Sequence, residues 1–256
     1  MNRFIDWLWV RRLRRLPHFR SPKMLGLPQK QRVLVFAPHS DDEWIGCGGT
    51  LSLLKANQCE IRVVVLSDGA QGDPSHFFEG DVKKKRQSET REVLGVLGID
   101  DPCFLNFPDG GLAEHLADLR RAVAQIYDEF APDWVFTTSF TEHHRDHVCV
   151  AYAVAHHWLS RGRRERLLAY EIYGSIRVDW LVDITSVMAL KRDMIRRYEI
   201  PLHYVDYEAA CVSVAQFRGI LVAGDPLEAS FAEAFMEIKP LDVWLDVFGR
   251  VMDRVG

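Results

Sequence analysis

The sequence predicts an α/β protein with a Rossmann-like, doubly wound and mostly parallel sheet. Short apolar runs alternate with segments of helical periodicity along most of the chain, which is typical of strands joined by crossover helices. Hydrophobic residues make up 48% of the 256 residues, enough to bury a full core. This length suits one large domain, and we expect that domain to occupy residues 31–256.

The elements of this domain follow one another in a regular order. We expect strands at 32–37, 61–66, 103–107, 134–138 and 167–173, and helices between them at 42–57, 81–97, 112–130 and 147–161. A chain that starts at a central strand and winds both ways has the strand order 3-2-1-4-5. After residue 173 the regular alternation of strands and helices ends. There we expect a C-terminal strand at 180–184, a helix at 185–198 and an apolar stripe at 244–255.

Residues 1–30 are expected to form a separate basic, amphipathic segment. Residues 1–31 contain eight arginines and lysines against the single acid Asp6, a net charge of +7, which leaves −11 for the remainder because the total is −4. With Trp7 and Trp9 on its apolar side, residues 1–20 are candidates for peripheral contact with a membrane surface. The alternative is a helix that docks its apolar stripe on the acidic body.

The composition argues against several classes of protein. A net charge of −4 and a pI near 6.2 give no basis for nucleic-acid binding. The five cysteines contain no C-x-x-C pair, so we expect neither a disulfide framework nor a thiolate zinc site, and a reducing, cytoplasmic location. No apolar run approaches the ~20 residues needed to cross a bilayer, so membrane contact would be peripheral, at the inner face.

An acidic motif follows the first predicted strand. Residues 37–43 read A-P-H-S-D-D-E, which places one imidazole and three carboxylates at the carboxyl end of a buried strand. Repulsion among these carboxylates is costly in a dry crevice unless a cation or protonation relieves it. His39 and Asp42 supply the nitrogen and oxygen ligands that a zinc-like ion accepts. Capping of the next helix explains one aspartate, but not a histidine with two adjacent acids.

A second cluster follows the fourth predicted strand, where residues 142–147 read E-H-H-R-D-H. In the strand order 3-2-1-4-5, strands one and four are neighbours, so the two clusters should face each other across the crevice at their carboxyl ends. Three protein ligands and one open position are the arrangement of catalytic zinc, where a bound water becomes a nucleophile toward a carbonyl.

The two clusters resemble the motifs of the PIG-L/LmbE family of zinc-dependent N-deacetylases. The family motifs A-H-P-D-D-E and H-P-D-H are matched by residues 38–43 and 144–147, and weaker similarity runs in register from about residue 31 to 240. The resemblance implies a hydrolase that removes the N-acetyl group from an N-acetylglucosamine-type amino sugar or glycoconjugate by attack of a metal-bound water. In the family the substrate is a small-molecule or lipid-linked amino sugar.

The resemblance also implies the metal ligands. His39, Asp42 and His147 correspond to the ligands of Zn²⁺, and Fe²⁺ is the alternative metal because it accepts similar ligands. Glu43 is expected to support the ligands rather than to bind the metal.

Further roles follow from the same resemblance. Asp41 is implied as the general base, and His144 as a charged imidazole that stabilises the tetrahedral intermediate, with Asp146 holding its ring. Arg86 and Asp109 correspond to positions that reach the sugar.

Two residues depart from the family motifs. Ser40 and Arg145 both stand where the motifs have proline. Arg145 adds a cation beside His144 and would lower the pKa of His144 unless it points at solvent or at an acidic substrate. An anionic glycan is therefore one hypothesis for the substrate.

Three functions remain open from the sequence. The first is the zinc-dependent N-deacetylase. The second is an amidase that acts on another acylated conjugate. The third is a non-catalytic membrane-interface protein, in which the α/β body carries the basic N-terminal segment.

Overall fold

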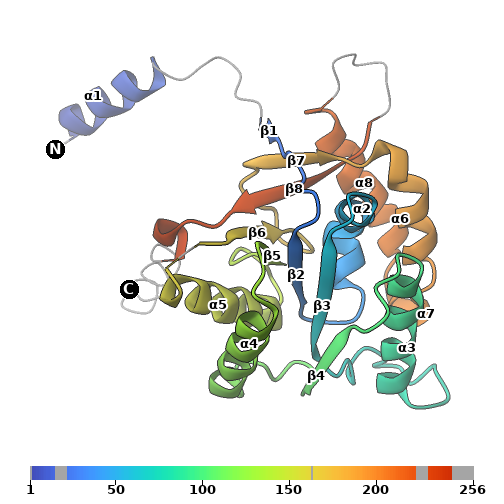
Figure 1. Cartoon of the computed structure of the whole chain (residues 1–256). Helices are drawn as coiled ribbons and strands as arrows, with labels where there is room; N and C mark the ends of the chain where they lie inside the picture. Colours follow the sequence, from blue (N-terminus) through green and yellow to red (C-terminus); the bar gives the residue numbers. More distant parts are fainter. Residues whose placement is uncertain (1, 15–21, 163, 223–229, 244–256) are drawn as a thin grey trace.

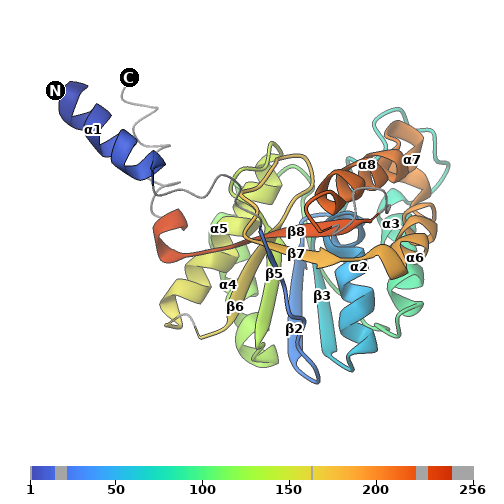
Figure 2. The same ribbon diagram turned by 90° about the horizontal axis from the view of Figure 1, so that it is seen from above.

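The computed structural model describes residues 2–14, 22–162, 164–222 and 230–243. A mixed sheet with the strand order β1-β7-β8-β6-β5-β2-β3-β4 runs through the body, and helices cover both of its faces (Figure 1, Figure 2). The strands are β1 (Lys23–Met24), β2 (Arg32–Ala37), β3 (Glu60–Ser67), β4 (Cys103–Phe107), β5 (Trp134–Thr138), β6 (Arg166–Tyr170), β7 (Trp180–Asp183) and β8 (Ala232–Glu237). The helices are α1 (Asn2–Leu13), α2 (Asp42–Ala56), α3 (Val82–Gly95), α4 (Leu116–Phe130), α5 (Arg145–Ser160), the 3₁₀ turn η1 (Thr185–Val187), α6 (Met188–Ile195), α7 (Glu199–Tyr204) and α8 (Tyr207–Gly219).

The five central strands confirm the predicted strand order. These strands are parallel and lie side by side in the order β4-β3-β2-β5-β6. Numbered along the chain as the five expected strands, this is the order 3-2-1-4-5. β2 is buried from Val33 to Ala37, as a central strand covered on both faces must be. The pairing of β2 with β5 places the carboxyl ends of these two strands side by side.

Alternate side chains of β2 enter two separate cores, one on each face of the sheet. Val33, Val35 and Ala37 pack in the core that includes buried side chains of α2, α3 and α6. Leu34 and Phe36 pack in the core that includes α4 and α5. The sheet is thus held between two apolar layers.

The C-terminal additions agree only in part with the expectation. β7 lies where the sequence predicts a strand, and α6 lies within the predicted helix 185–198. The pattern does not predict β8, which pairs antiparallel with β6 and with β7, because its alanines and glutamates are residues with low strand propensity. The apolar stripe at 244–255 lies outside the described residues.

The body begins earlier than the boundary at residue 31 suggests. Lys23 and Met24 pair in parallel with β7, and Leu25 is buried in the core. Within the segment 1–30, the residues from 23 onward therefore pack against the α/β body.

Helix α1 leaves its large apolar side chains in solvent. Their exposed fractions lie between 45% and 57%, for Ile5, Trp7, Leu8, Trp9, Val10 and Leu13. The guanidinium groups of Arg11 and Arg12 lie 5.3 and 5.7 Å from the ring centres of Trp7 and Trp9. In the described ranges, no helix has both the length and the apolar character needed to pass through a bilayer.

Helix α2, which begins at the carboxyl end of β2, is interrupted at Cys47 (φ −144°, ψ 19°). The interruption leaves the amides of Gly49 and Thr50 without helical acceptors, and both donate to the carboxylate of Glu233 on β8, at 2.8 and 2.7 Å. Lys191 on α6 compensates the charge of Glu233, with its Nζ 2.6 Å from Oε1. This buried pair joins three elements and holds α2 in place below the candidate site.

Candidate active site

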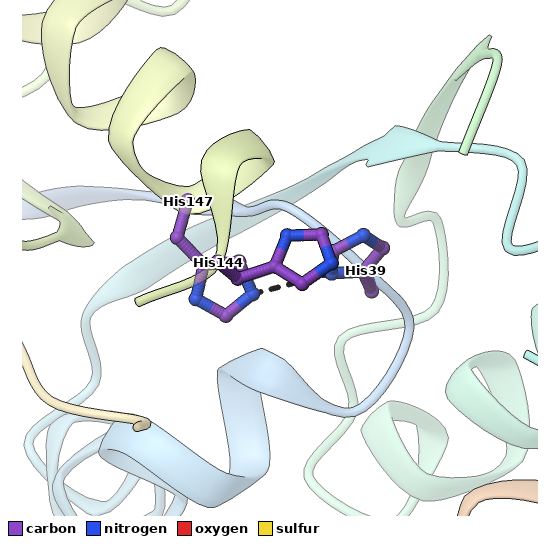
Figure 3. Close-up of side chains that lie close together, drawn as sticks. All are labelled: His39, His144 and His147. Carbon is purple, nitrogen blue, oxygen red and sulfur yellow. Dashed lines mark hydrogen bonds between the residues drawn. The ribbon is translucent and has the colours of Figure 1, made fainter. Parts of the chain in front are cut away.

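The two sequence clusters meet at the carboxyl edge of the sheet, as the strand order predicts. His39 follows β2 and His147 lies in the first turn of α5, and their rings point toward one another (Figure 3). His39 Nδ1 lies 3.2 Å from Asp42 Oδ2, Asp42 Oδ2 lies 3.3 Å from His147 Nε2, and His147 Nε2 lies 3.3 Å from His39 Nδ1. Three atoms with lone pairs therefore form a nearly equilateral triangle, and all three side chains are buried.

This triangle fits a divalent metal ion. Tetrahedral ligands at the Zn–N and Zn–O distances of 2.0–2.1 Å lie about 3.3–3.4 Å from one another, close to the separations here. Two imidazole nitrogens and a carboxylate oxygen also form a donor set that zinc accepts. Burial alone would lower the pKa of His147, but the carboxylates of Asp42 and Glu142 outweigh it and raise that pKa to about 9.

His144 lies beside this triangle rather than in it. Its ring centre is 4.8 Å from that of His39 and 5.0 Å from that of His147, and the three histidines present nitrogens within 4.8 Å of one another (Figure 3). His144 Nδ1 accepts a hydrogen bond from the Asp146 amide at 3.2 Å. The side chain is half-buried, and burial together with the two other histidines lowers the pKa of His144.

Carboxylates stand behind both histidines of the triangle. His39 Nε2 lies 3.1 Å from Asp109 Oδ1 and 3.5 Å from Asp146 Oδ2. His147 Nδ1 lies 3.5 Å from Glu142 Oε2. A carboxylate on the outer nitrogen fixes the ring orientation and directs the other nitrogen to the metal, an arrangement typical of zinc-binding histidines.

Asp146 is placed differently from the implied role of holding the His144 ring. Its carboxylate accepts hydrogen bonds from the amides of Gly110 (2.8 Å) and Leu112 (3.2 Å) and faces His39, while only its backbone amide contacts His144. The loop after β4 therefore takes up the carboxylate. Asp109 belongs to the same loop. It contacts His39 and also lines the polar cavity in front of the site.

Asp41 has a strained backbone and a carboxylate that is not used for helix capping. It is the N-cap residue of α2, yet its side chain makes no capping hydrogen bond, and its φ of 114° is rare for a residue other than glycine. Its Oδ2 lies 3.2 Å from Arg86 Nη2, which also donates to the carbonyl of Ser40 at 2.6 Å. Burial raises the pKa of Asp41 to about 8, against the opposing charge of Arg86.

Glu43 supports the site without facing the triangle. Its Oε1 accepts from the buried Tyr198 hydroxyl at 2.6 Å, and its Oε2 accepts from the Asp41 amide at 3.1 Å. The side chain thus secures the strained turn at Asp41. Burial raises the pKa of Glu43 to about 7.

A polar cavity of about 350 Å³ opens in front of these groups. The side chains that line it and bear directly on the site are those of His39, Asp41, Asp42, Arg86, Asp109 and His144. All of the residues proposed to bind the metal, act in catalysis or bind the substrate therefore converge here, with His147 and Asp146 directly behind. The exposed His143 does not line the cavity.

The loop between β3 and α3 forms one wall of the cavity. Asp73 anchors it by accepting from the amides of Phe77 and Phe78 and from the hydroxyl of Tyr204 on α7. The ring of Phe77 stacks on His203 with centres 3.8 Å apart. The loop and α7 are thus fastened together, and both contribute to the cavity wall.

Arg145 does not act on the site. Its side chain is 61% exposed and pairs with Glu114 at the surface. The cation that suggested an anionic glycan is therefore directed away from the cavity and compensated.

Two residues of the site have no signal in the sequence pattern. Tyr173 and Tyr207 line the cavity, and the ring of Tyr173 stacks on His147 with centres 5.5 Å apart. Glu142 lies within the second cluster, but only the structure shows that it accepts from the amides of Ile172 and Tyr173 (2.8 and 3.0 Å) while facing His147.

This chain is similar in sequence and in fold to known proteins. A family model described as GlcNAc-PI de-N-acetylase matches residues 34–158, which contain both clusters. A crystal structure of a conserved protein from Thermus thermophilus superposes with a TM-score of 0.69 and 26% identity, covering 82% of this chain and 95% of that one. The predicted α/β fold is thereby confirmed.

Two curated relatives carry different activities in their names. A diacetylchitobiose deacetylase from Thermococcus kodakarensis is 25% identical over 186 residues, which is 66% of this chain and 69% of that relative. A 4-oxalmesaconate hydratase from Pseudomonas putida is 28% identical over 132 residues, which is 49% of this chain and 50% of the hydratase. The chain thus aligns with about half to two thirds of the length of these relatives.

Proposed function

We propose that this chain, whose residues 34–158 match the family model described as GlcNAc-PI de-N-acetylase and whose fold matches that of solved relatives, is a zinc-dependent hydrolase that removes the N-acetyl group from an N-acetylglucosamine-type amino sugar or glycoconjugate. The observation that carries the proposal is the triangle of His39 Nδ1, Asp42 Oδ2 and His147 Nε2, with sides of 3.2–3.3 Å, at the base of a polar cavity. These three residues would hold the metal, and Zn²⁺ is the ion that suits the donor set, with Fe²⁺ as the alternative.

A bound divalent cation supplies Lewis acidity, which activates water and polarises the amide carbonyl. Asp41 acts as the general base: it takes a proton from the attacking water and delivers it to the nitrogen as the amide C–N bond breaks, so that acetate and a free amine leave. Arg86 positions the Asp41 carboxylate through the 3.2 Å contact of Nη2 with Oδ2.

His144 stabilises the negative charge that develops on the carbonyl oxygen. Because its Nδ1 accepts the Asp146 amide proton, its own proton lies on Nε2, which is then free to donate toward the cavity. A neutral imidazole thus serves in place of the charged one implied by the resemblance. Asp109 and Arg86 line the cavity where the sugar hydroxyls would lie.

The hydratase relative provides a second candidate reaction for the same site. A hydratase adds water across a carbon–carbon double bond, and a metal with a nearby carboxylate base suits that reaction as well. An amidase acting on another acylated conjugate is the third. Release of acetate and a primary amine from an N-acetylglucosaminide identifies the deacetylase, whereas loss of the absorbance of 4-oxalmesaconate identifies the hydratase.

Removal of the metal is expected to abolish deacetylation. After treatment with a chelator and desalting, we expect acetate release from N-acetylglucosaminides to fall more than 100-fold, because the carbonyl and the water lose their common electrophile. Adding one equivalent of Zn²⁺, or of Fe²⁺ under anaerobic conditions, should restore the rate. Acetate production and metal content per chain are the two measurements. A metal-free protein that keeps its rate would contradict the proposal.

We further propose that α1 attaches the protein to the inner, anionic face of a membrane, where a lipid-linked amino sugar would be presented to the cavity. In support, α1 exposes two tryptophans beside Arg11 and Arg12, a composition typical of interfacial helices. The same proposal includes a cytoplasmic location, where thiols stay reduced; none of the five cysteines, all of which lie in the described part of the chain, forms a disulfide.

Deletion of residues 1–21 is expected to reduce sedimentation with anionic vesicles at least tenfold, because each Arg near an anionic surface contributes about 1 kcal/mol. The cut must precede residue 23, since β1 pairs with β7. Turnover of a soluble substrate should remain within about twofold of the full chain. Equal sedimentation of both forms would rule out membrane attachment through α1.

A further inference from the structure

A second cavity, of about 270 Å³, lies next to the polar one and differs from it in character. It is enclosed by α8, the first turn of α2, β8 and the segment that follows β6, elements that lie together in both views (Figure 1, Figure 2). Its apolar lining comes mainly from Ile45, Ile172, Val205, Val214, Ala215 and Phe217. We call it the apolar cavity, and the one in front of the metal ligands the catalytic cavity.

The charged side chains of the apolar cavity compensate one another. Lys191 Nζ lies 2.6 Å from Glu233, and Arg218 lies 2.7 and 2.9 Å from the two oxygens of Glu171. Among the residues that the structure describes, these four are the charged ones that line the cavity. Because each charge already has a partner inside the protein, the cavity offers a ligand apolar surface rather than an unpaired charge.

The two cavities share a wall. Tyr173, Val205 and Tyr207 line both of them, and the hydroxyls of the two tyrosines meet at 2.5 Å. The ring of Tyr173 stacks on the candidate ligand His147. A group attached to a molecule in the catalytic cavity would reach the apolar cavity at this tyrosine pair, which both cavities share.

Exposed apolar side chains at the rim of the apolar cavity also indicate a binding site. Tyr173, Val205, Val214 and Phe217 all line the apolar cavity and are between 44% and 62% exposed. Large apolar side chains gathered around an opening are typical of a binding site for an apolar group.

We propose that the apolar cavity binds an alkyl or aryl group of about eight to ten carbon atoms, covalently attached to the amino sugar in the catalytic cavity. The size follows from the volume, since a cavity of about 150 Å³ holds benzene and a water molecule takes up about 30 Å³ of liquid. This inference rests on the proposed deacetylase function and specifies its substrate class as an amphipathic amino sugar. The apolar group is either the aglycone or the N-acyl chain, which share this chemistry.

The first experiment measures kcat/KM for two series of substrates. One series contains methyl, butyl, octyl and dodecyl N-acetylglucosaminides, and the other contains methyl glucosaminides with N-acetyl, N-butanoyl and N-octanoyl groups, all below their micelle-forming concentrations. Each buried methylene can raise kcat/KM about threefold to fourfold. We expect a rise of at least tenfold up to the octyl chain and none beyond it, in the series that corresponds to the attachment point. Flat profiles in both series would overturn the inference.

Substitutions in the apolar cavity should act on the long chain selectively. Val214→Asp places a charge in the cavity, and we expect it to lower the octyl-to-methyl ratio of kcat/KM at least tenfold. Ala210→Phe fills the same cavity from α8 and should act in the same direction, which guards against misfolding of the first variant. Val96→Asp is the matched control, because Val96 is 48% exposed and lines neither cavity. A ratio unchanged in Val214→Asp and Ala210→Phe would also overturn the inference.

A binding measurement separates this inference from the proposed function. Methyl and octyl glucosaminides carry no acetyl group, so calorimetric titration reports their affinity without turnover. We expect the octyl compound to bind at least tenfold more tightly than the methyl compound, and Val214→Asp to remove the difference. If no acetylated glycoside is turned over but this difference is present, the deacetylase proposal fails and the apolar site stands. If turnover occurs with equal binding of both compounds and with a flat profile in the N-acyl series, the reverse holds.

Discussion

The Asp41→Asn variant is expected to release acetate about 10²–10⁴-fold more slowly than the wild type, with its metal content unchanged. Asparagine has the size of aspartate but cannot accept the proton of the attacking water. It is also one of the residues that tolerate a positive φ best, which matters because φ at this position is 114°. An alanine variant would combine the loss of the base with backbone strain, whereas asparagine isolates the loss of the base.

The control for this variant is Asp193→Asn, which makes the same chemical change at an exposed site on α6 where Asp193 pairs with Arg196. We expect its rate to match that of the wild type. The measurement is kcat for acetate release, together with metal bound per chain and the midpoint of thermal unfolding. If Asp41→Asn keeps its metal and turns over within threefold of the wild type, Asp41 is not the general base.

The meeting of the two clusters could be predicted from the sequence because it depends only on strand order. A chain that starts at a central strand makes β2 and β5 neighbours, and this pairing alone brings His39 and His147 together across more than a hundred residues. The buried, β-branched character of these strands is a strong signal, so the central sheet was predictable too.

The orientation of individual side chains could not be predicted, because it depends on loop conformation. The Asp146 carboxylate turns away from His144 since the loop after β4 presents the amides of Gly110 and Leu112 to it. Nothing in the spacing of the motif encodes this contact. The stretch after β6 that carries Tyr173 likewise reaches the site through the amides that bind Glu142.

β8 shows a different limit of sequence reasoning. Its sequence A-E-A-F-M-E has low strand propensity, yet the segment is buried between β6 and β7. Tertiary context decides its structure: Glu233 is needed there to bind the free amides of Gly49 and Thr50, and the charge of Lys191 makes its burial tolerable.

The His147→Ala variant is expected to lose its metal and, with it, more than 10³-fold of the rate of acetate release. One vertex of the triangle disappears, and a site with two protein ligands binds the ion far more weakly, since even the loss of a supporting residue costs 10–100-fold in affinity. The most direct readout is thermal unfolding. In the wild type, free metal at 100 times its Kd stabilises the fold by about 2.7 kcal/mol, and in the variant the same concentration should produce no shift.

His143→Ala is the control, because this histidine belongs to the same motif but is exposed and lines no part of the cavity.

Two further variants decide which third group completes the metal site. The distances favour Asp42, whose Oδ2 lies within 3.2–3.3 Å of both ligand nitrogens, over His144, whose Nδ1 is occupied by an amide. Asp42→Asn should therefore lose the metal-dependent shift in unfolding, while His144→Gln should keep it and still lose turnover. The opposite pattern would assign His144 to the metal and remove it from the stabilisation of the carbonyl oxygen.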